Sequence, residues 1–277
     1  MLLRSITGLS LLLSVLFFAL GDLSLWLLPL LFAGVWLLLA LLAFAFLWTV
    51  CSLVDYEKPQ EHDSHFYRSV MYVYIEALIS LVLVRLRTRG LEKAPKEGRF
   101  LLVCNHLFLA DPGILLHCFR RSQLSFITKK ENYDLPIVGK FMHKILCQAV
   151  ERDNDRQALK SILKCIQLIK EDEVSVGVFP EGYTSKDGKL HPFRPGVFKI
   201  AQKTGVPIVV CTIQNTRQIF KNLRKLKKTD VDLHLVTVIQ PEEIQGKTTV
   251  EVSDMIYEIM ISDLGENFRY SESAQNT

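Results

Sequence analysis

The sequence predicts a layered α/β domain built around a mainly parallel sheet, with a hairpin of two apolar helices in front of it. Two observations indicate this fold class. From residue 84 onward, short aliphatic runs of strand length alternate with segments of helical periodicity. Before them, two almost wholly apolar segments, Leu2 to Leu20 and Leu25 to Leu53, are separated only by a short turn that contains Gly21 and Asp22.

Each apolar segment is long enough to cross a hydrocarbon core of about 30 Å as a helix. They account for a mean hydropathy of +0.21 in a chain of 277 residues. Arg4 precedes the first segment, and Lys58 and Arg68 follow the second, so the positive charges place both ends of the hairpin in the cytoplasm. Two alternatives stay open: Met1 to Gly21 could be a cleaved signal peptide, and the hairpin could dip into one leaflet only.

We divide the chain into a membrane hairpin over residues 1–55, a linker with an interfacial helix over residues 56–82, and the α/β domain over residues 83–277. The helix is expected over Phe66 to Ser80, either at the membrane interface or packed on the domain. Val84 to Arg89 alternates with a period of two, which predicts a strand with one basic face.

The remaining elements follow from hydrophobic runs and their flanking signals. The expected strands are Phe100 to Val103, Leu124 to Thr128, Cys147 to Val150, Val174 to Phe179, Val206 to Ile213 and Val231 to Ile239. The expected helices are Pro112 to Phe119, Leu135 to Leu146, one that is capped by Asp153 or Asn154 and ends at Lys170, Gly196 to Lys203, and Val250 to Leu264.

A histidine follows the first buried strand. Asn105 and His106 come directly after this strand, and Asp111 stands five residues after the histidine and directly before Pro112. Asp before Pro predicts a helix start with Asp111 as the N-cap. A histidine with a carboxylate behind it can be held in one tautomer and can accept a proton from a hydroxyl, and strand ends are where open α/β sheets place such chemistry. Alone the pair is a weak signal, since a capping aspartate and an ordinary loop histidine also produce it.

A second motif, Phe179-Pro180-Glu181-Gly182, ends a later buried strand. In this order, Asn105, His106, Asp111 and the second motif resemble the glycerolipid acyltransferase family, which makes phosphatidic acid from lysophosphatidic acid. The resemblance covers Val82 to Ile213. Its flanking parts are Gly90-Leu91-Glu92, Lys129 and Val206-Pro207-Ile208-Val209.

The resemblance implies a membrane-bound enzyme that moves a fatty acyl group from acyl-CoA or acyl-carrier protein to the sn-2 hydroxyl of lysophosphatidic acid. His106 would be the general base and Asp111 its orienter. Substrate contacts would come from Asn105, Lys129, Arg152, Phe179, Pro180, Glu181 and Gly182. Arg194 is an additional electrostatic candidate for the phosphate. The sequence contains no Gly-x-Ser-x-Gly elbow, which favours direct attack by the acceptor hydroxyl without an acyl-enzyme.

The sequence departs from the family pattern mainly around the presumed acceptor site. Phe108 stands where Ser is frequent, Tyr183-Thr184 where Thr-Arg is frequent, Leu146 and Ala149 where a glycine and an aromatic residue are usual, and Val210 where a second proline is common. The reaction type is therefore better supported than the acceptor. Another lysophospholipid or glycerol 3-phosphate is an alternative acceptor, and a non-catalytic, membrane-tethered lipid-binding protein is the alternative from another class.

We expect no cofactor and no metal. The six cysteines lie in apolar contexts without paired spacing, although Cys104, two residues before His106, leaves a cysteine nucleophile open. The basic run from Arg217 to Lys228 favours contact with anionic lipid head groups or an acidic carrier protein over nucleic acid, with a solvated helix face as the plainer alternative. The expected partners are thus membrane lipids, a lysophospholipid acceptor and, as one donor, acyl-carrier protein.

Overall fold

The computed structural model describes residues 1–21, 24–151 and 155–271. Within them, seven strands form one sheet in the order β1-β7-β6-β2-β5-β3-β4, in which β6 and β7 pair antiparallel and all other neighbours are parallel. The prediction of a mainly parallel sheet is confirmed. The strands are β1 (Val84–Arg89), β2 (Leu101–Cys104), β3 (Leu124–Lys129), β4 (Gln148–Val150), β5 (Ser175–Val178), β6 (Ile208–Gln214) and β7 (Thr229–Ile239).

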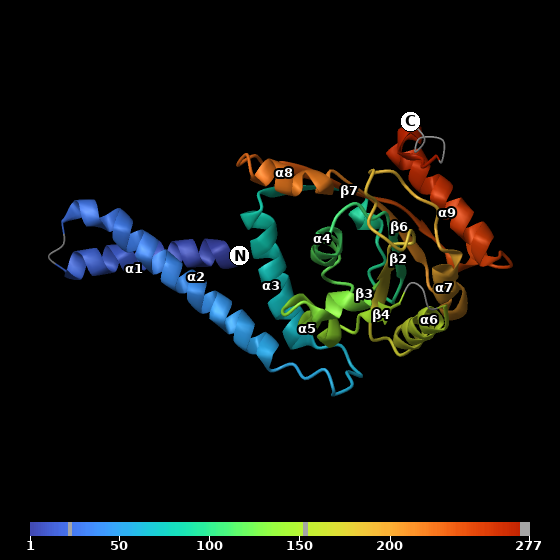
Figure 1. Ribbon diagram of the computed structural model, residues 1–277, viewed down its shortest axis with the longest axis horizontal. Helices are drawn as coiled ribbons and strands as arrows, with labels where there is room; N and C mark the ends of the chain where they lie inside the picture. Colours follow the sequence, from blue (N-terminus) through green and yellow to red (C-terminus); the bar gives the residue numbers. More distant parts are fainter. Residues whose placement is uncertain (22–23, 152–154, 272–277) are drawn as a thin grey trace.

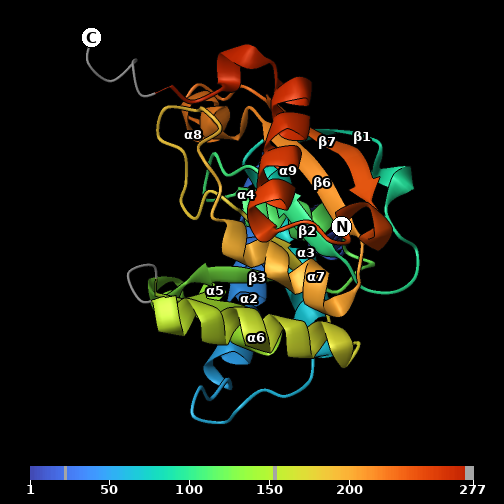
Figure 2. The same ribbon diagram turned by 90° about the vertical axis from the view of Figure 1, so that its right-hand side faces the viewer.

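Helices cover both faces of this sheet. The α-helices of the described residues are α1 (Leu2–Leu20), α2 (Leu28–Ser52), α3 (His65–Leu81), α4 (Asp111–Cys118), α5 (Val138–Lys144), α6 (Asp155–Lys170), α7 (Lys199–Thr204), α8 (Ile219–Leu223) and α9 (Thr249–Leu264). Helices α3, α4 and α5 lie on one face (Figure 1). Helices α6, α7 and α9 lie on the other and stand in front of the strands in Figure 2.

The alternation of side chains along each strand divides the core into two layers. Leu102 and Cys104 of β2 pack with α3 and α4, whereas Leu101 and Val103 pack with α6, α7 and α9. All four are fully buried, because successive side chains of a strand point to opposite faces and here both faces are covered. The central strands are therefore continuous apolar runs.

The two N-terminal helices form a hairpin that projects away from the domain (Figure 1). Both are long and apolar enough to cross a membrane. Trp36 of α2 donates its indole N–H to the Thr7 hydroxyl of α1 at 3.2 Å, while most leucines of α2 remain exposed. An apolar surface of this size, left uncovered by protein, is compatible with membrane association.

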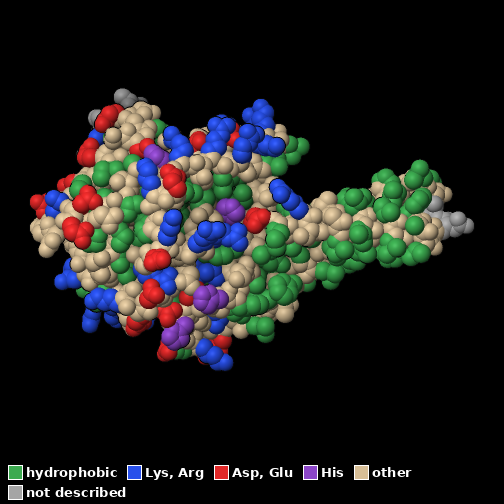
Figure 3. Space-filling model, turned by 180° about the vertical axis from the view of Figure 1, so that it is seen from behind, with side chains coloured by type: hydrophobic (Ala, Val, Ile, Leu, Met, Phe, Trp, Pro, Cys, Tyr) green, Lys and Arg blue, Asp and Glu red, His purple; other side chains and the backbone are tan. Residues whose placement is uncertain are grey.

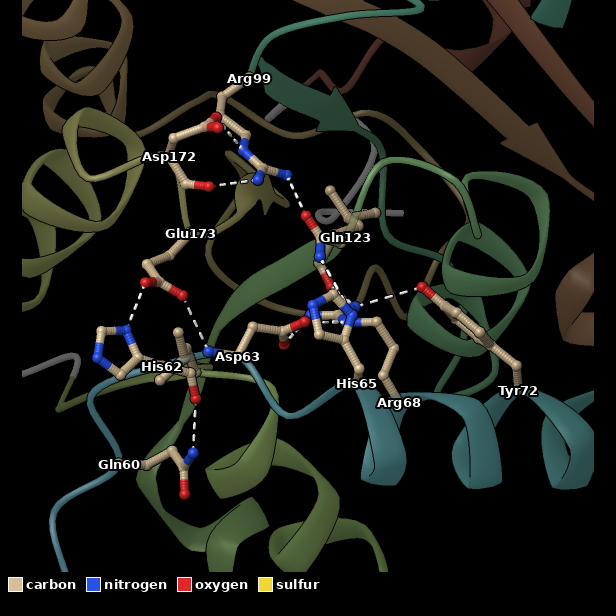
Figure 4. A network of polar contacts seen from close by, with 12 residues as sticks. Gln60, His62, Asp63, His65, Arg68, Tyr72, Arg99, Gln123, Asp172 and Glu173 are labelled. Carbon is tan, nitrogen blue, oxygen red and sulfur yellow. Dashed lines mark hydrogen bonds and ion pairs between the residues drawn. The ribbon is translucent and has the colours of Figure 1, made fainter.

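A polar network connects the linker and α3 to the domain at the amino ends of the strands (Figure 4). Arg68 binds both carboxylate oxygens of Asp63, at 2.8 and 2.6 Å, and donates to the Leu124 carbonyl at the start of β3. Asp63 in turn donates its backbone N–H to Glu173, which precedes β5. The expected interfacial helix therefore packs on the domain through a buried ion pair.

The structure corrects some of the local expectations. Asp111 is the first residue of α4 and not its N-cap, which is Ala110. The expected helix caps Asp153 and Asn154 lie outside the described residues. Helix α8 lies within the basic run, for which a solvated helix face was the plainer alternative, but its bounds were not predicted because it is only one turn long. The basic face of β1 is paired: Arg85 and Arg87 both bind Asp230 of β7, at 3.2 and 2.6 Å.

Candidate active site

His106 and Asp111 meet in the loop between β2 and α4. The Nδ1 atom of His106 lies 2.9 Å from Oδ2 of Asp111, whose side chain is fully buried. The same oxygen accepts the backbone N–H groups of Leu107 and Phe108, both at 2.7 Å. Because this carboxylate oxygen only accepts, it holds the proton of His106 on Nδ1 and leaves Nε2 as a free base. Asp111 thus shapes the loop and orients the imidazole.

Aromatic rings support the imidazole from one face. The ring of Phe179, which follows β5, stacks on His106 with centroids 4.1 Å apart and an angle of 21°. Phe126 of β3 stacks on Phe179 at 5.6 Å and 8°. Gly177 lies behind Phe126, and a Cβ at this glycine would come within 2.4 Å of the Phe126 ring. The His106 imidazole therefore stacks on Phe179, which in turn stacks on Phe126. Phe126 fits there only because residue 177 has no side chain.

Glu181 is directed into the protein. One oxygen accepts the backbone N–H of His106 at 2.9 Å and the other accepts that of His191 at 3.1 Å. Only 1% of Glu181 is exposed, and this burial raises its pKa to about 8. The two hydrogen bonds from backbone N–H groups lower the pKa, but burial has the larger effect. Ser185 donates its backbone N–H to the His106 carbonyl at 2.8 Å. The loop after β5 therefore holds the backbone of the histidine on both sides.

A cleft of about 1250 Å³ lies beside this loop. Its cations include Lys129, Lys130, Lys186 and Arg194, and Tyr183, His191 and Tyr270 also line it. Acidic side chains stand among the cations: Lys129 lies 2.9 Å from Glu131, and Lys130 lies 2.6 Å from Glu151. Arg194 approaches the motif closely, since its backbone N–H donates to the Pro180 carbonyl at 2.8 Å and a Cβ at Gly182 would lie 2.9 Å from its Nε. Gly182, with a φ of +78°, leaves room for this arginine.

The remaining predicted site residues have different positions. The side-chain amide of Asn105 is buried and bonds both backbone groups of Ile213 in β6, at 2.9 and 2.8 Å, so its visible contacts are structural. Lys129 ends β3 at the rim of the cleft. Arg152 lies outside the described residues. His106, Asp111 and the segment from Phe179 to Gly182 are brought together at the carboxyl edge of the sheet.

Cys104 is fully buried on the core side of β2. Burial raises the pKa of its thiol well above the ordinary value. A cysteine nucleophile needs an accessible thiolate, and this environment disfavours the thiolate. The geometry favours His106 without a cysteine partner.

Two further features of the site were not anticipated from the sequence. Phe126 and Gly177 are ordinary strand residues in the sequence, and only the pairing of β3 with β5 places them behind the histidine. His191 lies 3.0 Å from Asp187 and packs on Tyr270, with ring centroids 4.2 Å apart. The spacing of Asp187 and His191, four residues apart, was the signal in the sequence that could have revealed the second pair.

The protein is thus a three-layer α/β protein that carries a histidine–aspartate pair at the carboxyl edge of its sheet, where open α/β sheets bind their ligands. Residues 85–214 match the model of the Acyltransferase family. The matched region is therefore an Acyltransferase domain, in agreement with the glycerolipid acyltransferase motifs found in the sequence.

Curated relatives and a solved structure agree with this assignment. The chain is 36% identical over 132 residues to a chloroplastic 1-acyl-sn-glycerol-3-phosphate acyltransferase of Brassica napus, spanning 47% of this chain and 38% of that protein. It is 26% identical over 187 residues to the 1-acyl-sn-glycerol-3-phosphate acyltransferase of Borreliella burgdorferi, and the match covers 66% of this chain and 74% of that protein. The crystal structure of the 1-acyl-sn-glycerophosphate acyltransferase PlsC of Thermotoga maritima has the same fold, with a TM-score of 0.61, 24% identity, and coverage of 82% of this chain and 90% of that one. The match spans well under two thirds of the Brassica relative's length.

Proposed function

We propose that this protein transfers a fatty acyl group from a thioester donor, acyl-CoA or acyl-carrier protein, to the sn-2 hydroxyl of lysophosphatidic acid, which gives phosphatidic acid. The observation that carries the proposal is the His106–Asp111 pair, in which the Nδ1 contact of 2.9 Å leaves Nε2 for the substrate. The names of the Brassica and Borreliella relatives support the choice of acceptor.

The chemistry follows from this arrangement. Nε2 of His106 takes the proton of the acceptor hydroxyl as its oxygen attacks the thioester carbonyl. The tetrahedral intermediate collapses with loss of the thiolate, which receives the proton from the imidazolium. Asp111 stabilises that imidazolium at Nδ1 while its own charge is held by two backbone N–H groups. No covalent acyl-enzyme is required.

The cleft beside Gly182 is the place for the acceptor's phosphate. Arg194 and Lys129 line it, and an arginine can bind a phosphate through two parallel hydrogen bonds. Lys129 contacts Glu131, so an incoming phosphate would compete with a carboxylate for this lysine. We assign Arg194 the larger share of phosphate binding because a guanidinium can bind a phosphate through two hydrogen bonds, whereas a lysine offers a point charge.

We also propose that the hairpin anchors the protein in the membrane and that the α/β domain faces the cytoplasm. The acceptor is a membrane lipid, and a site beside an anchored hairpin meets it without leaving the surface. Basic residues on both sides of the hairpin support this orientation.

Mass spectrometry of the products made by the purified full chain tests the function. The protein is offered lysophosphatidic acid, other lysophospholipids and glycerol 3-phosphate, each with acyl-CoA and with acyl-carrier protein. We expect phosphatidic acid as the main product and none above background with His106→Ala. A product from another acceptor alone would replace the proposed substrate, and no product from any combination would favour a non-catalytic lipid-binding role.

A further inference from the structure

A tight turn after α8 presents a leucine between basic residues. The chain reads Arg-Lys-Leu-Lys-Lys from Arg224 to Lys228, and Leu226 at its centre is 83% exposed with a φ of +51°. The backbone N–H groups of Lys225 and Lys227 both donate to the Asn222 carbonyl at 2.9 Å. A left-handed conformation is unfavourable for leucine, so the turn is held by these bonds in a form that directs an apolar side chain to the outside.

This turn adjoins the part of the protein next to the hairpin. Thr229, directly after the turn, donates its backbone N–H to the Leu83 carbonyl at 3.0 Å, and Leu83 follows the end of α3. Near that end, Leu78 and Leu81 are 57% and 60% exposed. The amino group of Met1, at the start of the hairpin, pairs with Glu76 of the same helix. Exposed apolar side chains therefore continue from the hairpin along α3 to the turn.

The other side of α8 reaches the loop that holds the catalytic histidine. Phe220 is 47% exposed and packs edge-to-face on Phe108, with ring centroids 5.1 Å apart. Phe108 lies two residues after His106, and Leu109 beside it is 69% exposed. We call Leu78, Leu81, Leu109, Phe220, Leu226 and the exposed basic residues around α8 the α8 surface.

Every charged side chain from Ile219 to Lys228 is basic. Lys and Arg side chains gather at the top of the molecule in Figure 3, where Figure 1 places α8, close to where the hairpin leaves the domain. The exposed basic residues are Lys221, Arg224, Lys225, Lys227 and Lys228. In the described part of the chain, no carboxylate forms an ion pair with any of these five. An anionic partner can therefore bind them without displacing a carboxylate.

We propose that the α8 surface docks on an anionic lipid bilayer, with Leu226 among the acyl chains, and forms the path by which membrane lipid reaches His106. Cations beside solvent-exposed Leu and Phe side chains fit a bilayer, where phosphates and hydrocarbon lie at successive depths. An acidic carrier protein would match the charges but not the exposed leucines. Continuity with the hairpin also places the surface at the membrane.

Photo-crosslinking of the full chain in vesicles tests the docking without any assay of transfer. Leu226 is replaced by p-benzoylphenylalanine, and Leu163, a 53% exposed leucine of α6 on the far side of the domain, receives the same change as a matched control. We expect a lipid adduct at position 226, stronger when phosphatidylglycerol is mixed into phosphatidylcholine, and none at position 163. Absence of a lipid adduct at 226 overturns the proposal, and so does an equal adduct at 163. An adduct with added acyl-carrier protein in place of lipid overturns it in favour of a protein-docking surface.

A second measurement, which rests on the proposed function, tests whether the α8 surface delivers membrane lipid to the active site. Lys225→Gln, Leu226→Ser and Lys227→Gln are combined, and Lys160→Gln, Leu163→Ser and Lys164→Gln are the matched change on α6. Each lost charge near an anionic surface weakens association about fivefold. We expect the first variant to lose at least about fivefold in rate on acceptor embedded in phosphatidylglycerol vesicles. It should keep the parent's rate on a dissolved short-chain acceptor, and the α6 variant should match the parent on both. Equal losses of the first variant on both forms of acceptor would overturn the delivery role. If the parent itself is inactive, the proposed function fails while the crosslinking result still decides the docking.

Discussion

Phe179 stacks face to face on His106, with the two ring centroids 4.1 Å apart. The contact joins the loop after β2 to the end of β5, and Phe126 supports it from β3 at 5.6 Å. Asp111 holds one edge of the imidazole and Phe179 one face, so that rotation of the ring is restricted in two directions. A general base needs such restriction, since small misplacements of a catalytic group are costly.

Gly177→Ala tests the role of this stack. The new Cβ would lie 2.4 Å from the Phe126 ring, which must move and release Phe179 from its position on His106. We expect kcat to fall about ten- to a hundredfold with KM values close to the parent's. Steady-state kinetics measure both, and circular dichroism checks the fold. Gly113→Ala in α4, where a Cβ meets nothing within 4 Å, is the control and should leave kcat unchanged. An unchanged kcat in Gly177→Ala would show that the stack does not position the base.

His106→Ala should abolish transfer while the fold and membrane association persist. The side chain, which is 15% exposed, lies outside both core layers, and loss of a general base costs about two to four orders of magnitude in rate. Cys104→Ala is the comparison, because its buried thiol takes no part in the reaction proposed here and most activity should remain. Initial rates with purified proteins decide both points. Activity of His106→Ala within about tenfold of the parent contradicts the role of the base.

Glu181 predicts a pH dependence of stability. Its pKa is about 8 in the folded protein against 4.5 for the free side chain, so the folded chain keeps a proton that the unfolded chain has released. The free energy of unfolding should therefore fall as the pH rises from 4.5 toward about 8. Glu181→Gln cannot ionise and should lose this part of the slope. Thermal midpoints of both proteins across this pH range provide the measurement, and parallel curves would contradict the raised pKa.

The buried pair of Arg68 and Asp63 should contribute to stability much more than a surface pair. Their side chains are 4% and 2% exposed, and Arg68→Ala leaves the Asp63 charge buried without its partner, which costs about 3 to 5 kcal/mol. Arg87→Ala breaks a pair with Asp230 that is 56% and 37% exposed, where about 1 kcal/mol or less is expected. Thermal unfolding in one detergent compares the two variants. Similar midpoints for both would show that the linker is not held through this pair.

Membrane orientation gives a further prediction. Basic residues on both sides of the hairpin favour the cytoplasm, so a protease-sensitive tag fused to the C-terminus should be protected in sealed spheroplasts and cleaved after lysis. A tag in a known periplasmic protein serves as the control for accessibility. Cleavage of the C-terminal tag in intact spheroplasts would place the domain on the other side.

Much of the architecture follows from local patterns in the sequence. The strands β2, β5 and β6 can be recognised in the sequence as apolar runs, because strands covered on both faces contain few polar residues. Element ends were less predictable. The expected helix over Leu135 to Leu146 is shortened to α5, Val138–Lys144, because the chain forms a bend and a turn from Leu135 to Ile137. The bounds of the one-turn helix α8 were not predicted, because its few residues show no helical periodicity.

The sequence by itself determined the histidine–aspartate pair, because His106 and Asp111 are close enough along the chain for a single loop to join them. It also determined the alternation of strands and helices that brings this loop and the Phe179–Gly182 segment to one edge of the sheet. Only the tertiary structure decided what surrounds the base. Glu181 binds the backbone of His106 from 75 positions away, and its burial sets its pKa. Phe126 stands behind the site because β3 pairs with β5 and Gly177 leaves it space. Desolvation and ring packing depend on neighbours distant in the chain, and for that reason no local pattern encodes them.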